Sequence, residues 1–357
     1  MNSSDRWLLF WSLLLLIVLT VIISYFLFSG FSGKSFLHLP IGFTSEEDKD
    51  FRKVEVFFNT RDYDKSINLA LDFLSEFPES RHRFRVMTIL AESFFNKREY
   101  SISEKYVMKV LADPHVDMNS YVDANIIFGA IYREYEKFNP VVLHYLEDAY
   151  IKADRNEKLL LSTFIGYQYL YKKEYRTALR FFNESSGEEG IIGRARVYVE
   201  EGNYPGAIQE YANYFNSYPA NERYTRVKQA FLKQSFYYAD FLRKKKDYDM
   251  ALKYYINVVN FFPKEKEADE ALVKMAEIYE ENKDYKNALF YFDRALNNAV
   301  TNSDESALYN KAKIYYETKN YREAISFFRE FQSRFPSSLL SDKVAEWIDI
   351  ATKEISN

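Results

Sequence analysis

Aromatic and small residues recur along this chain at helical spacing, and the same arrangement returns many times. Seven times a tyrosine opens a helix-like run and is followed three residues later by Ala or Ser. Five of these tyrosines also have Phe or Tyr seven residues on, so the three positions share one face of a helix. The pairs are Tyr63/Ser66, Tyr100/Ser103, Tyr175/Ala178, Tyr204/Ala207, Tyr248/Ala251, Tyr285/Ala288 and Tyr321/Ala324. This internal repeat predicts helices packed in a regular array.

A wider register surrounds each of these tyrosines, which we call anchors. A small residue usually stands nine positions before the anchor, and an aromatic residue usually stands six before it. The same register identifies an eighth copy on Phe138, with Gly129, Tyr132 and Tyr145 at the matching offsets. Most anchors lie 36 to 38 residues apart, and this period predicts a solenoid of stacked helix pairs. We expect the small residues to act as sockets for side chains of the partner helix: Ala91, Gly166, Ala195, Ala239, Ala276 and Ala312.

Polar turns and prolines predict where the second helix of each pair begins and ends. The residue before the anchor often has a side-chain oxygen that can cap the helix, as in Asp62, Asn203, Asp247, Asp284 and Asn320. Asn320 is followed three residues later by Glu323, which predicts a capping-box-like pair. Proline lacks an amide donor and ends helices, and it stands fourteen or fifteen residues after five anchors: Pro78, Pro114, Pro219, Pro263 and Pro336.

The repeated pattern resembles the tetratricopeptide repeat, over roughly residues 46–336 and in eight copies. At these offsets it has small, aromatic, Asp-Tyr, Ala, aromatic and Pro residues in that order. The resemblance implies an all-α solenoid whose first helices line a concave groove that binds a protein or peptide segment. The ending Phe-x-x-x-Phe-Pro-x-Ser, at residues 73–80 and 331–338, further resembles tetratricopeptide proteins of bacterial envelopes, including assembly lipoproteins and Tol-Pal-associated periplasmic proteins.

The groove positions implied by the resemblance carry many rings. At these offsets stand Phe95, Phe164, Tyr167, Tyr171, Phe236, Tyr237, Tyr309 and Tyr316, among charged neighbours. These are the candidate partner-binding residues. The alternative is that about half of the rings are buried against neighbouring helices. The Lys, Asn and Arg trio that clamps a peptide carboxyl terminus in some members is missing, so a peptide C-terminus is not the expected ligand.

Two anchor spacings are irregular. Tyr175 and Tyr204 are only 29 residues apart, whereas Tyr204 and Tyr248 are 44 apart. Five of the ten glycines fall in the same stretch, which marks a possible joint near residues 185–222. Glycine either loosens a helical array or permits a very close helix approach, and both interpretations stay open. Beyond Pro336, residues 337–357 are expected to form a terminal cap, with an amphipathic helix over 341–355.

The N-terminus carries a second clear signal. After a short tail, residues 1–6, the run 7–28 has 22 residues without a charge. As a helix it would reach about 33 Å, enough to cross a hydrocarbon core. We therefore expect a transmembrane helix followed by a linker over 29–45. The alternative is a secretory signal cleaved within residues 1–32, although this run is longer than a typical signal core.

Charge and composition limit the localisation, the partners and the activities that we expect for this chain. Arg6 and the terminal amine favour the N-terminus inside, which in a bacterial inner membrane would place the repeats in the periplasm. The chain lacks cysteine, which excludes a lipoprotein anchor, and its net charge of −4 predicts no nucleic-acid partner. The four histidines are scattered and no catalytic, phosphate-binding or metal-binding motif is present, so we expect no enzyme activity, cofactor, metal or small-molecule substrate.

The expected function is therefore that of a single-pass, membrane-anchored scaffold that holds another protein, in the assembly or maintenance of the bacterial envelope. One alternative is a periplasmic chaperone-like factor that handles envelope proteins. The other is a non-catalytic accessory subunit of a cell-envelope enzyme. Capture of bound proteins by the chain in detergent would separate these three functions. Many unfolded clients would indicate the chaperone-like factor, one stoichiometric partner the scaffold, and an enzyme complex the accessory subunit.

The first prediction tests the anchor and its orientation. In spheroplasts of a Gram-negative host, added protease should digest the repeats of the full chain, because the flanking charge favours the N-terminus inside. The intact mass should include residues 1–28. A mass beginning after Ser29 would refute the anchor, and protection of the repeats in sealed spheroplasts would refute the orientation.

Overall fold

The computed structural model describes residues 45–185, 187–218, 220, 223–298 and 303–356. Within these ranges it contains 17 α-helices and no strand. The chain divides into two compact units, residues 1–52 and 53–357. The described part of the first unit is residues 45–52, which include the start of one helix, and the packing analysed below belongs to the second unit.

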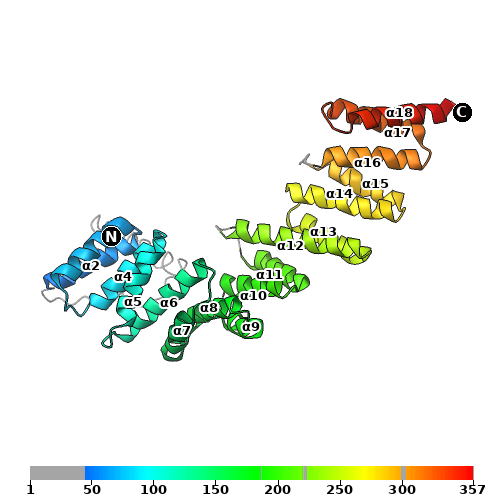
Figure 1. The fold of residues 1–357 in the computed structure, drawn as a ribbon. Helices are drawn as coiled ribbons and strands as arrows, with labels where there is room; N and C mark the ends of the chain where they lie inside the picture. Colours follow the sequence, from blue (N-terminus) through cyan, green and yellow to red (C-terminus); the bar gives the residue numbers. More distant parts are fainter. Residues whose placement is uncertain (1–44, 186, 219, 221–222, 299–302, 357) are drawn as a thin grey trace, which may run out of the picture. The chain divides into compact units, whose positions relative to one another are not determined.

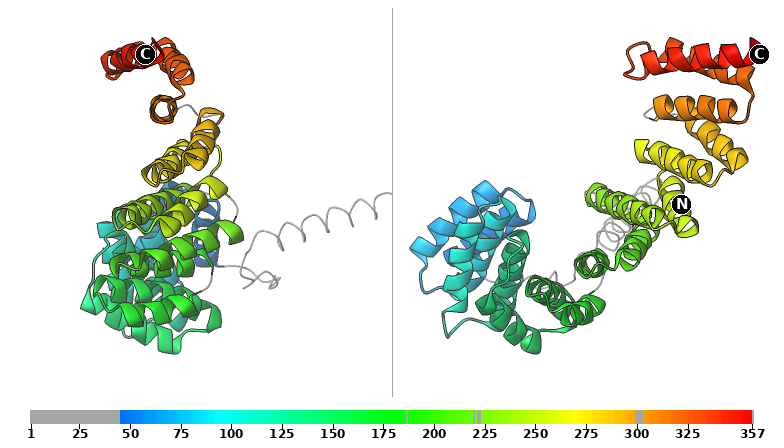
Figure 2. Two further views of the ribbon diagram at one scale, coloured as in Figure 1. Left: turned by 90° about the vertical axis from the view of Figure 1, so that its right-hand side faces the viewer. Right: turned by 45° about the vertical axis from the view of Figure 1, so that its right-hand side comes forward.

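The helices alternate as first and second members of eight pairs, and one helix follows the last pair (Figure 1). From α3 onward, each helix packs against the next one along the chain (Figure 2). The predicted all-α solenoid is therefore confirmed. The helices are α2 (Glu46–Asn59), α3 (Tyr63–Glu76), α4 (Arg83–Asn96), α5 (Tyr100–Leu111), α6 (Met118–Glu134), α7 (Pro140–Lys152), α8 (Arg155–Tyr171), α9 (Tyr175–Glu184), α10 (Glu188–Glu200), α11 (Tyr204–Ser217), α12 (Tyr224–Lys244), α13 (Tyr248–Phe261), α14 (Lys266–Glu281), α15 (Tyr285–Leu296), α16 (Asp304–Glu317), α17 (Tyr321–Arg334) and α18 (Ser341–Ser356).

One backbone turn joins the two helices in all eight pairs. The residue two before each anchor has a positive φ, from 48° at Glu136 to 73° at Gly202. The residue just before the anchor donates its N–H to the carbonyl of the residue that stands six before the anchor, as from Asp284 to Tyr279 at 2.8 Å. This is the Schellman end of a helix. Because it recurs at Phe138, it supports the anchor register in the copy that lacks tyrosine. The positive-φ residues are Arg61, Arg98, Glu136, Lys173, Gly202, Lys246, Lys283 and Lys319.

The capping predictions are confirmed at four turns and wrong at one. Asp62, Asn203, Asp247 and Asp284 each accept the N–H three residues ahead, at 3.1 to 3.4 Å. Asn320 makes no such bond, because its amide turns back to donate to the Thr318 hydroxyl at 3.1 Å. The expected pair of Asn320 with Glu323 is therefore absent. A capping box is formed instead at the start of α8, by Asp154 and Glu157.

The proline stops agree with the helix ends. Helices α3, α5, α13 and α17 all end two or three residues before a proline. Pro219 lies outside the described residues.

The sockets form the core of each pair. Ala91, Ala195, Ala239, Ala276 and Ala312 are all fully buried, as are the alanines that follow the anchors. Where the anchor is followed by serine, its hydroxyl donates to the facing socket backbone, as from Ser103 to the Ala91 carbonyl at 2.7 Å. Four of the aromatic residues seven after the anchors are fully buried as well, namely Phe182, Tyr255, Phe292 and Phe328. Large rings therefore fill the space that the small residues leave open.

The glycine-rich stretch is closely packed around one ring. The Phe182 side chain on α9 is fully buried between Gly166 of α8 and Gly193 of α10. A Cβ atom added at Gly193 would lie 2.3 Å from the ring, and one added at Gly166 would lie 2.8 Å from it. Any side chain at either position would displace Phe182, so these two glycines permit a close helix approach. The short spacing between Tyr175 and Tyr204 is thus accommodated by a short α9 and dense packing.

The C-terminal helix α18 covers the last pair, as predicted. Val344 and Ala351 are fully buried, and Trp347 and Ile348 pack against the same cluster. The Trp347 ring lies 4.9 Å from that of Tyr316 and stacks at 6.2 Å from that of Phe328.

The described part of the chain holds no helix both long and apolar enough to cross a membrane. The expected tail, membrane span and linker occupy residues 1–45, of which only Ser45 is described, so this prediction lies outside the described residues.

A second prediction tests the repeat register through stability. Replacing Ala312 with Leu in the full chain should lower the free energy of unfolding by about 1 to 3 kcal/mol, because the site is fully buried and the extra carbons overpack it. Lys319→Ala should change the free energy of unfolding by less than about 0.5 kcal/mol, because the Lys319 side chain is exposed. Position 319 has a positive φ, and that conformation is equally unfavourable for lysine and for alanine. Thermal unfolding followed by circular dichroism measures both. Equal, negligible effects would show that the register is wrong.

Candidate functional site

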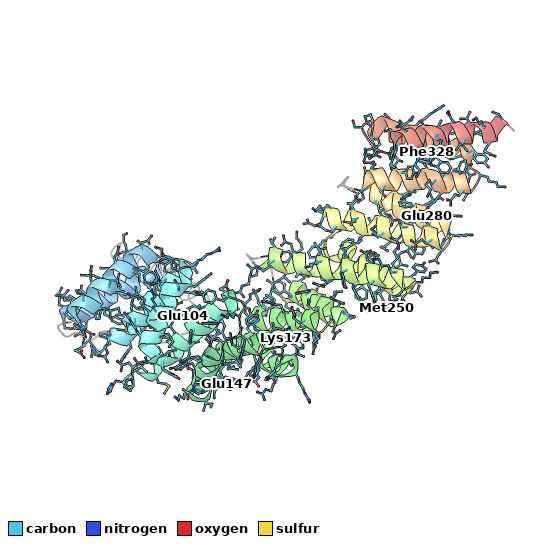
Figure 3. All side chains as sticks on the ribbon, in the orientation of Figure 1. Glu104, Glu147, Lys173, Met250, Glu280 and Phe328 are labelled. Atoms are coloured by element: carbon cyan, nitrogen blue, oxygen red, sulfur yellow. The ribbon has the colours of Figure 1, made fainter. Side chains whose placement is uncertain are left out.

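The eight candidate rings lie on four first helices but differ in exposure. Phe95 lies on α4, Phe164, Tyr167 and Tyr171 on α8, Phe236 and Tyr237 on α12, and Tyr309 and Tyr316 on α16. Figure 3 shows the side chains that cover these helices. Three of the eight are buried, namely Phe164, Tyr167 and Tyr309, and four are half-buried. Tyr237 is 55% exposed.

The buried rings have local partners that explain their burial. Phe164 covers Gly129 of α6, where an added Cβ would lie 2.5 Å from the Phe164 Cβ. The Tyr309 hydroxyl accepts a hydrogen bond from the Trp347 indole at 3.3 Å. The first helices α4, α6, α8 and α10 contact one another in sequence, so part of their groove-facing side is used for packing.

Tyr167 and Tyr171 form the centre of a polar and aromatic cluster on α8. Their rings stack at 6.1 Å. The Arg196 guanidinium lies over both rings, 5.5 Å from that of Tyr167 and 5.8 Å from that of Tyr171. The Tyr171 hydroxyl donates to the Arg133 carbonyl at 3.1 Å, which joins α8 to the end of α6. The structure therefore brings two of the candidate rings together with two arginines.

Next to this cluster is a cavity of about 530 Å³, which we call the arginine cleft. Its walls come from the end of α6, from α8, α10 and α11, and from the first turns of α12. Its lining residues are Arg133, Glu134, Glu136, Tyr167, Glu189, Ile192, Arg196, Tyr211, Arg223, Arg226, Val227 and Ala230.

The irregular anchor spacing produces one wall of the arginine cleft. Helix α12 begins at Tyr224, 24 residues before its anchor Tyr248, whereas α10 begins at Glu188, 16 residues before Tyr204. The additional turns of α12 carry Arg226 and Val227, and Arg223 stands at its N-cap. These arginines therefore lie before the part of α12 that follows the repeat pattern.

Glu189 connects several groups in the cleft. Its carboxylate accepts from Arg133 at 3.0 Å and from the Tyr167 hydroxyl at 3.1 Å, and it forms an ion pair with Arg223. Burial, reinforced by the charge of Glu189, raises the pKa of Tyr167, so its phenol stays protonated and donates. Burial also raises the pKa of Tyr211 to about 12. This preformed network of hydrogen bonds and ion pairs therefore holds the walls of the cleft together.

A second cavity, of about 460 Å³, adjoins the arginine cleft. It shares Glu136 and Arg196 with that cleft and is lined also by Tyr171 and Lys173. Arg196 donates to Glu136 at 2.8 Å, so this ion pair stands between the two cavities.

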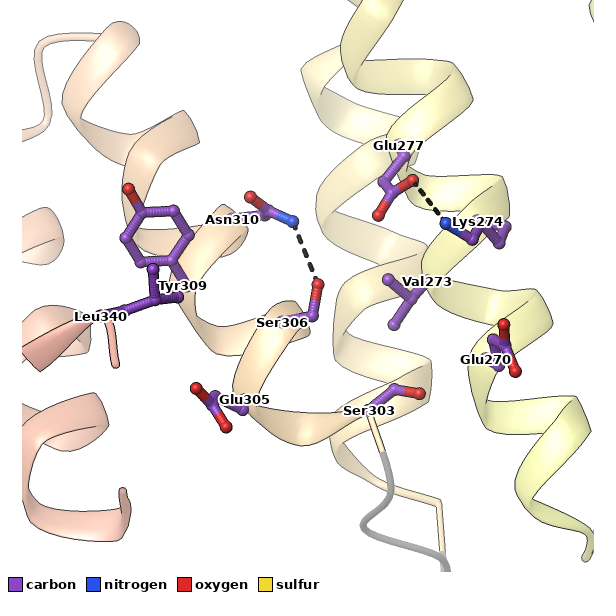
Figure 4. Close-up of a pocket in the computed structure, with 10 residues that line it drawn as sticks. All are labelled: Glu270, Val273, Lys274, Glu277, Ser303, Glu305, Ser306, Tyr309, Asn310 and Leu340. Carbon is purple, nitrogen blue, oxygen red and sulfur yellow. Dashed lines mark hydrogen bonds and ion pairs between the residues drawn. The ribbon is translucent and has the colours of Figure 1, made fainter. Parts of the chain in front are cut away.

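A third cavity, of about 540 Å³, lies between α14 and α16 (Figure 4). Glu270, Lys274 and Glu277 line it from α14, and Tyr309 lines it from α16. Lys274 lies 3.5 Å from Glu277, which Arg243 also contacts at 2.7 Å. This cavity is acidic, in contrast to the arginine cleft.

The exposed Tyr237 ring belongs to a separate aromatic group. It lies 4.9 Å from the Tyr204 ring at the start of α11. Phe236, the other α12 candidate, packs 5.7 Å from the Tyr255 ring. The candidate rings are therefore distributed along the first helices and do not form one patch.

Sequence reasoning did not identify Glu189, Tyr211, Arg223 and Arg226 as site residues. The signals that marked their stretch of the chain were the two irregular spacings, 29 residues before Tyr204 and 44 residues after it, and the cluster of glycines. Within the described ranges no group of three or more His, Cys, Asp or Glu side chains is placed to hold a metal ion.

Comparison with known proteins supports the repeat assignment. The family model for anaphase-promoting complex, cyclosome, subunit 3, which is tetratricopeptide-like, matches residues 281–341. No curated protein matches the chain. With eight units in phase, each with the same turn between its helices, the chain is a tetratricopeptide repeat protein.

Solved structures of tetratricopeptide proteins are similar to the chain at low identity. The C-terminal part of a repeat protein from Cytophaga hutchinsonii is 13% identical, with 69% of this chain and 94% of that chain covered and a TM-score of 0.49. A thermophilic protein of Thermus thermophilus is 16% identical, with 53% and 98% covered and a TM-score of 0.37. Human IFIT1, solved as a dimer with m7Gppp-AAAA, is 16% identical, with 82% and 65% covered and a TM-score of 0.39.

A third prediction concerns the network in the arginine cleft. Glu189→Ala should lower the free energy of unfolding by about 1 to 3 kcal/mol, because it leaves the half-buried Arg133 and the buried Tyr167 hydroxyl without a shared acceptor. Glu134→Ala removes another partner of Arg133 at the end of α6 and should cost less than about 1 kcal/mol. Denaturant titration of the two variants measures the difference. If Glu134→Ala costs as much as Glu189→Ala, Glu189 is not the centre of the network.

Proposed function

We propose that this tetratricopeptide protein is a scaffold that acts by binding another protein, and that its first helices contact a segment of that partner. The observation that carries this proposal is the combination of accessible rings and charged cavities on α8, α10 and α12. Tyr171 is half-buried and Tyr237 is 55% exposed, so both rings are accessible from solvent. Exposed aromatic groups beside arginines are the residue types that dominate protein interfaces.

The position of the scaffold in the cell forms part of the same proposal. The uncharged run of residues 7–28 would anchor the chain in a bacterial inner membrane, with the repeats on the periplasmic side. The partner would then be a protein of envelope assembly or maintenance, with the chaperone-like factor and the enzyme accessory subunit as alternatives. Capture of proteins by the full chain in detergent, followed by mass spectrometry, separates these roles.

A fourth prediction tests binding by the rings. The double variant Tyr171→Ala with Tyr237→Ala should weaken capture of the partner by about 30-fold or more, since losing a central aromatic contact costs about 2 kcal/mol or more. The variant should keep its helical content, because neither ring is fully buried.

A matched control lies on a second helix. Phe290 on α15 is 53% exposed, close to the 55% of Tyr237, and Phe290→Ala should leave capture unchanged. Loss of fold together with loss of binding in the double variant would mean that the rings are core. Full capture by a folded double variant would mean that the partner binds elsewhere.

A further inference from the structure

The four arginines of the arginine cleft are not equally available to a ligand. Arg133 and Arg223 both contact Glu189, whose side chain is only 21% exposed. These two guanidinium groups are committed to a carboxylate held inside the wall. Arg196 and Arg226 line the same cavity but do not contact Glu189.

Arg196 is held in a defined position with a replaceable partner. The faces of Tyr167 and Tyr171 support its guanidinium, as cation–π contacts do. Its ion-pair partner is Glu136, whose side chain is 65% exposed. A pair this exposed contributes little to stability, so another carboxylate can replace Glu136. The guanidinium itself stays in place, because the tyrosine rings hold it.

Arg226 stands across the cleft on the additional turns of α12. It is exposed, and no ion pair or hydrogen bond joins it to another part of the chain that the structure describes. The cavity is also lined by the apolar side chains of Ile192, Val227 and Ala230. The cleft therefore offers two available positive charges together with an apolar surface.

We propose that the arginine cleft binds an acidic segment of the partner protein, in which two carboxylates flank an apolar side chain. One carboxylate takes the place of Glu136 on Arg196, and the second pairs with Arg226. The apolar side chain lies against Ile192 and Val227. Charged hydrogen bonds to arginine are strong and directional, so the two positions set both the affinity and the register of the segment.

The remaining charges of the cleft favour carboxylates over denser anions. Glu134, Glu136 and Glu189 all line the cavity and would repel a doubly charged phosphate more strongly than a single carboxylate. The volume of about 530 Å³ is in the range of ligand sites and accommodates a few side chains. This inference rests on the proposed function, because it assigns a chemical class to the segment that the first helices bind.

The test uses the full chain in detergent and a fluorescein-labelled peptide of three Glu-Leu-Glu-Gly repeats with an amidated C-terminus. Fluorescence anisotropy should detect binding that weakens as salt rises. The double variant Arg196→Gln with Arg226→Gln should bind at least 10-fold more weakly. Arg180→Gln, an exposed arginine on α9, is the matched control and should bind like the unchanged chain.

A second variant should change the peptide affinity in the opposite direction. Glu136→Gln removes the resident carboxylate from Arg196 and should tighten peptide binding several-fold. A loss of stability alone cannot produce tighter binding, so this variant separates a role in recognition from a role in folding. Weaker or unchanged binding in Glu136→Gln would overturn the proposal.

Probe controls define the remaining outcomes. Absence of peptide binding by the unchanged chain would overturn the proposal, as would equal binding of a peptide with Lys in place of Glu. Stronger binding of an oligoadenylate would assign the arginines to RNA instead. If the arginine variant still captures the partner while Tyr171→Ala with Tyr237→Ala does not, the scaffold function stands and acid recognition fails.

Discussion

The turn between the two helices of a pair is the constraint on which the rest of this structure depends. In all eight pairs a residue with positive φ ends the first helix, and the next amide returns to the carbonyl six residues before the anchor. This closure fixes where the second helix begins. Once that point is fixed, the anchor, the small residue after it and the following ring face the socket of the first helix. Glycine fills the positive-φ position once, and charged residues fill it seven times, so backbone hydrogen bonds rather than residue type define the turn.

The two irregular anchor spacings matter because the rest of the array is regular. Where the spacing falls to 29 residues, glycines at 166 and 193 let Phe182 fill the contact between three helices. Where it rises to 44, the added residues lengthen α12 at its start. Dense packing on one side and an extended helix on the other leave the arginine cleft between them. The site is thus a product of departure from the repeat.

The sequence predicted the periodic features well, because each depends on residues close together in the chain. The anchors, the sockets, the helix ends at prolines and the helix α18 all follow from local spacing. Asn320 was misjudged because a nearby hydroxyl, that of Thr318, competes for its side chain.

Features that depend on neighbouring units could not be predicted in this way. The offset rule placed Phe164 and Tyr167 in the groove, but close contact of α6, α8 and α10 buries them. Glu189 and Arg226 are separated from Arg133 by whole helices, and periodicity holds no information on which charges meet. The two irregular anchor spacings and the glycine cluster marked the region, but they did not show which charges meet there.

The Arg196–Glu136 pair joins residues 60 positions apart, in an array where most contacts are between adjacent helices. Glu136 follows α6, Tyr167 lies on α8, Arg196 on α10 and Arg226 on α12. Four consecutive pairs must therefore be folded and stacked before these groups meet. In a linear array the units can open one at a time, and each opening inside this group of four dissolves the cleft. A ligand bound in the cleft would therefore oppose local opening of any of the four units. It would stabilise the middle of the array.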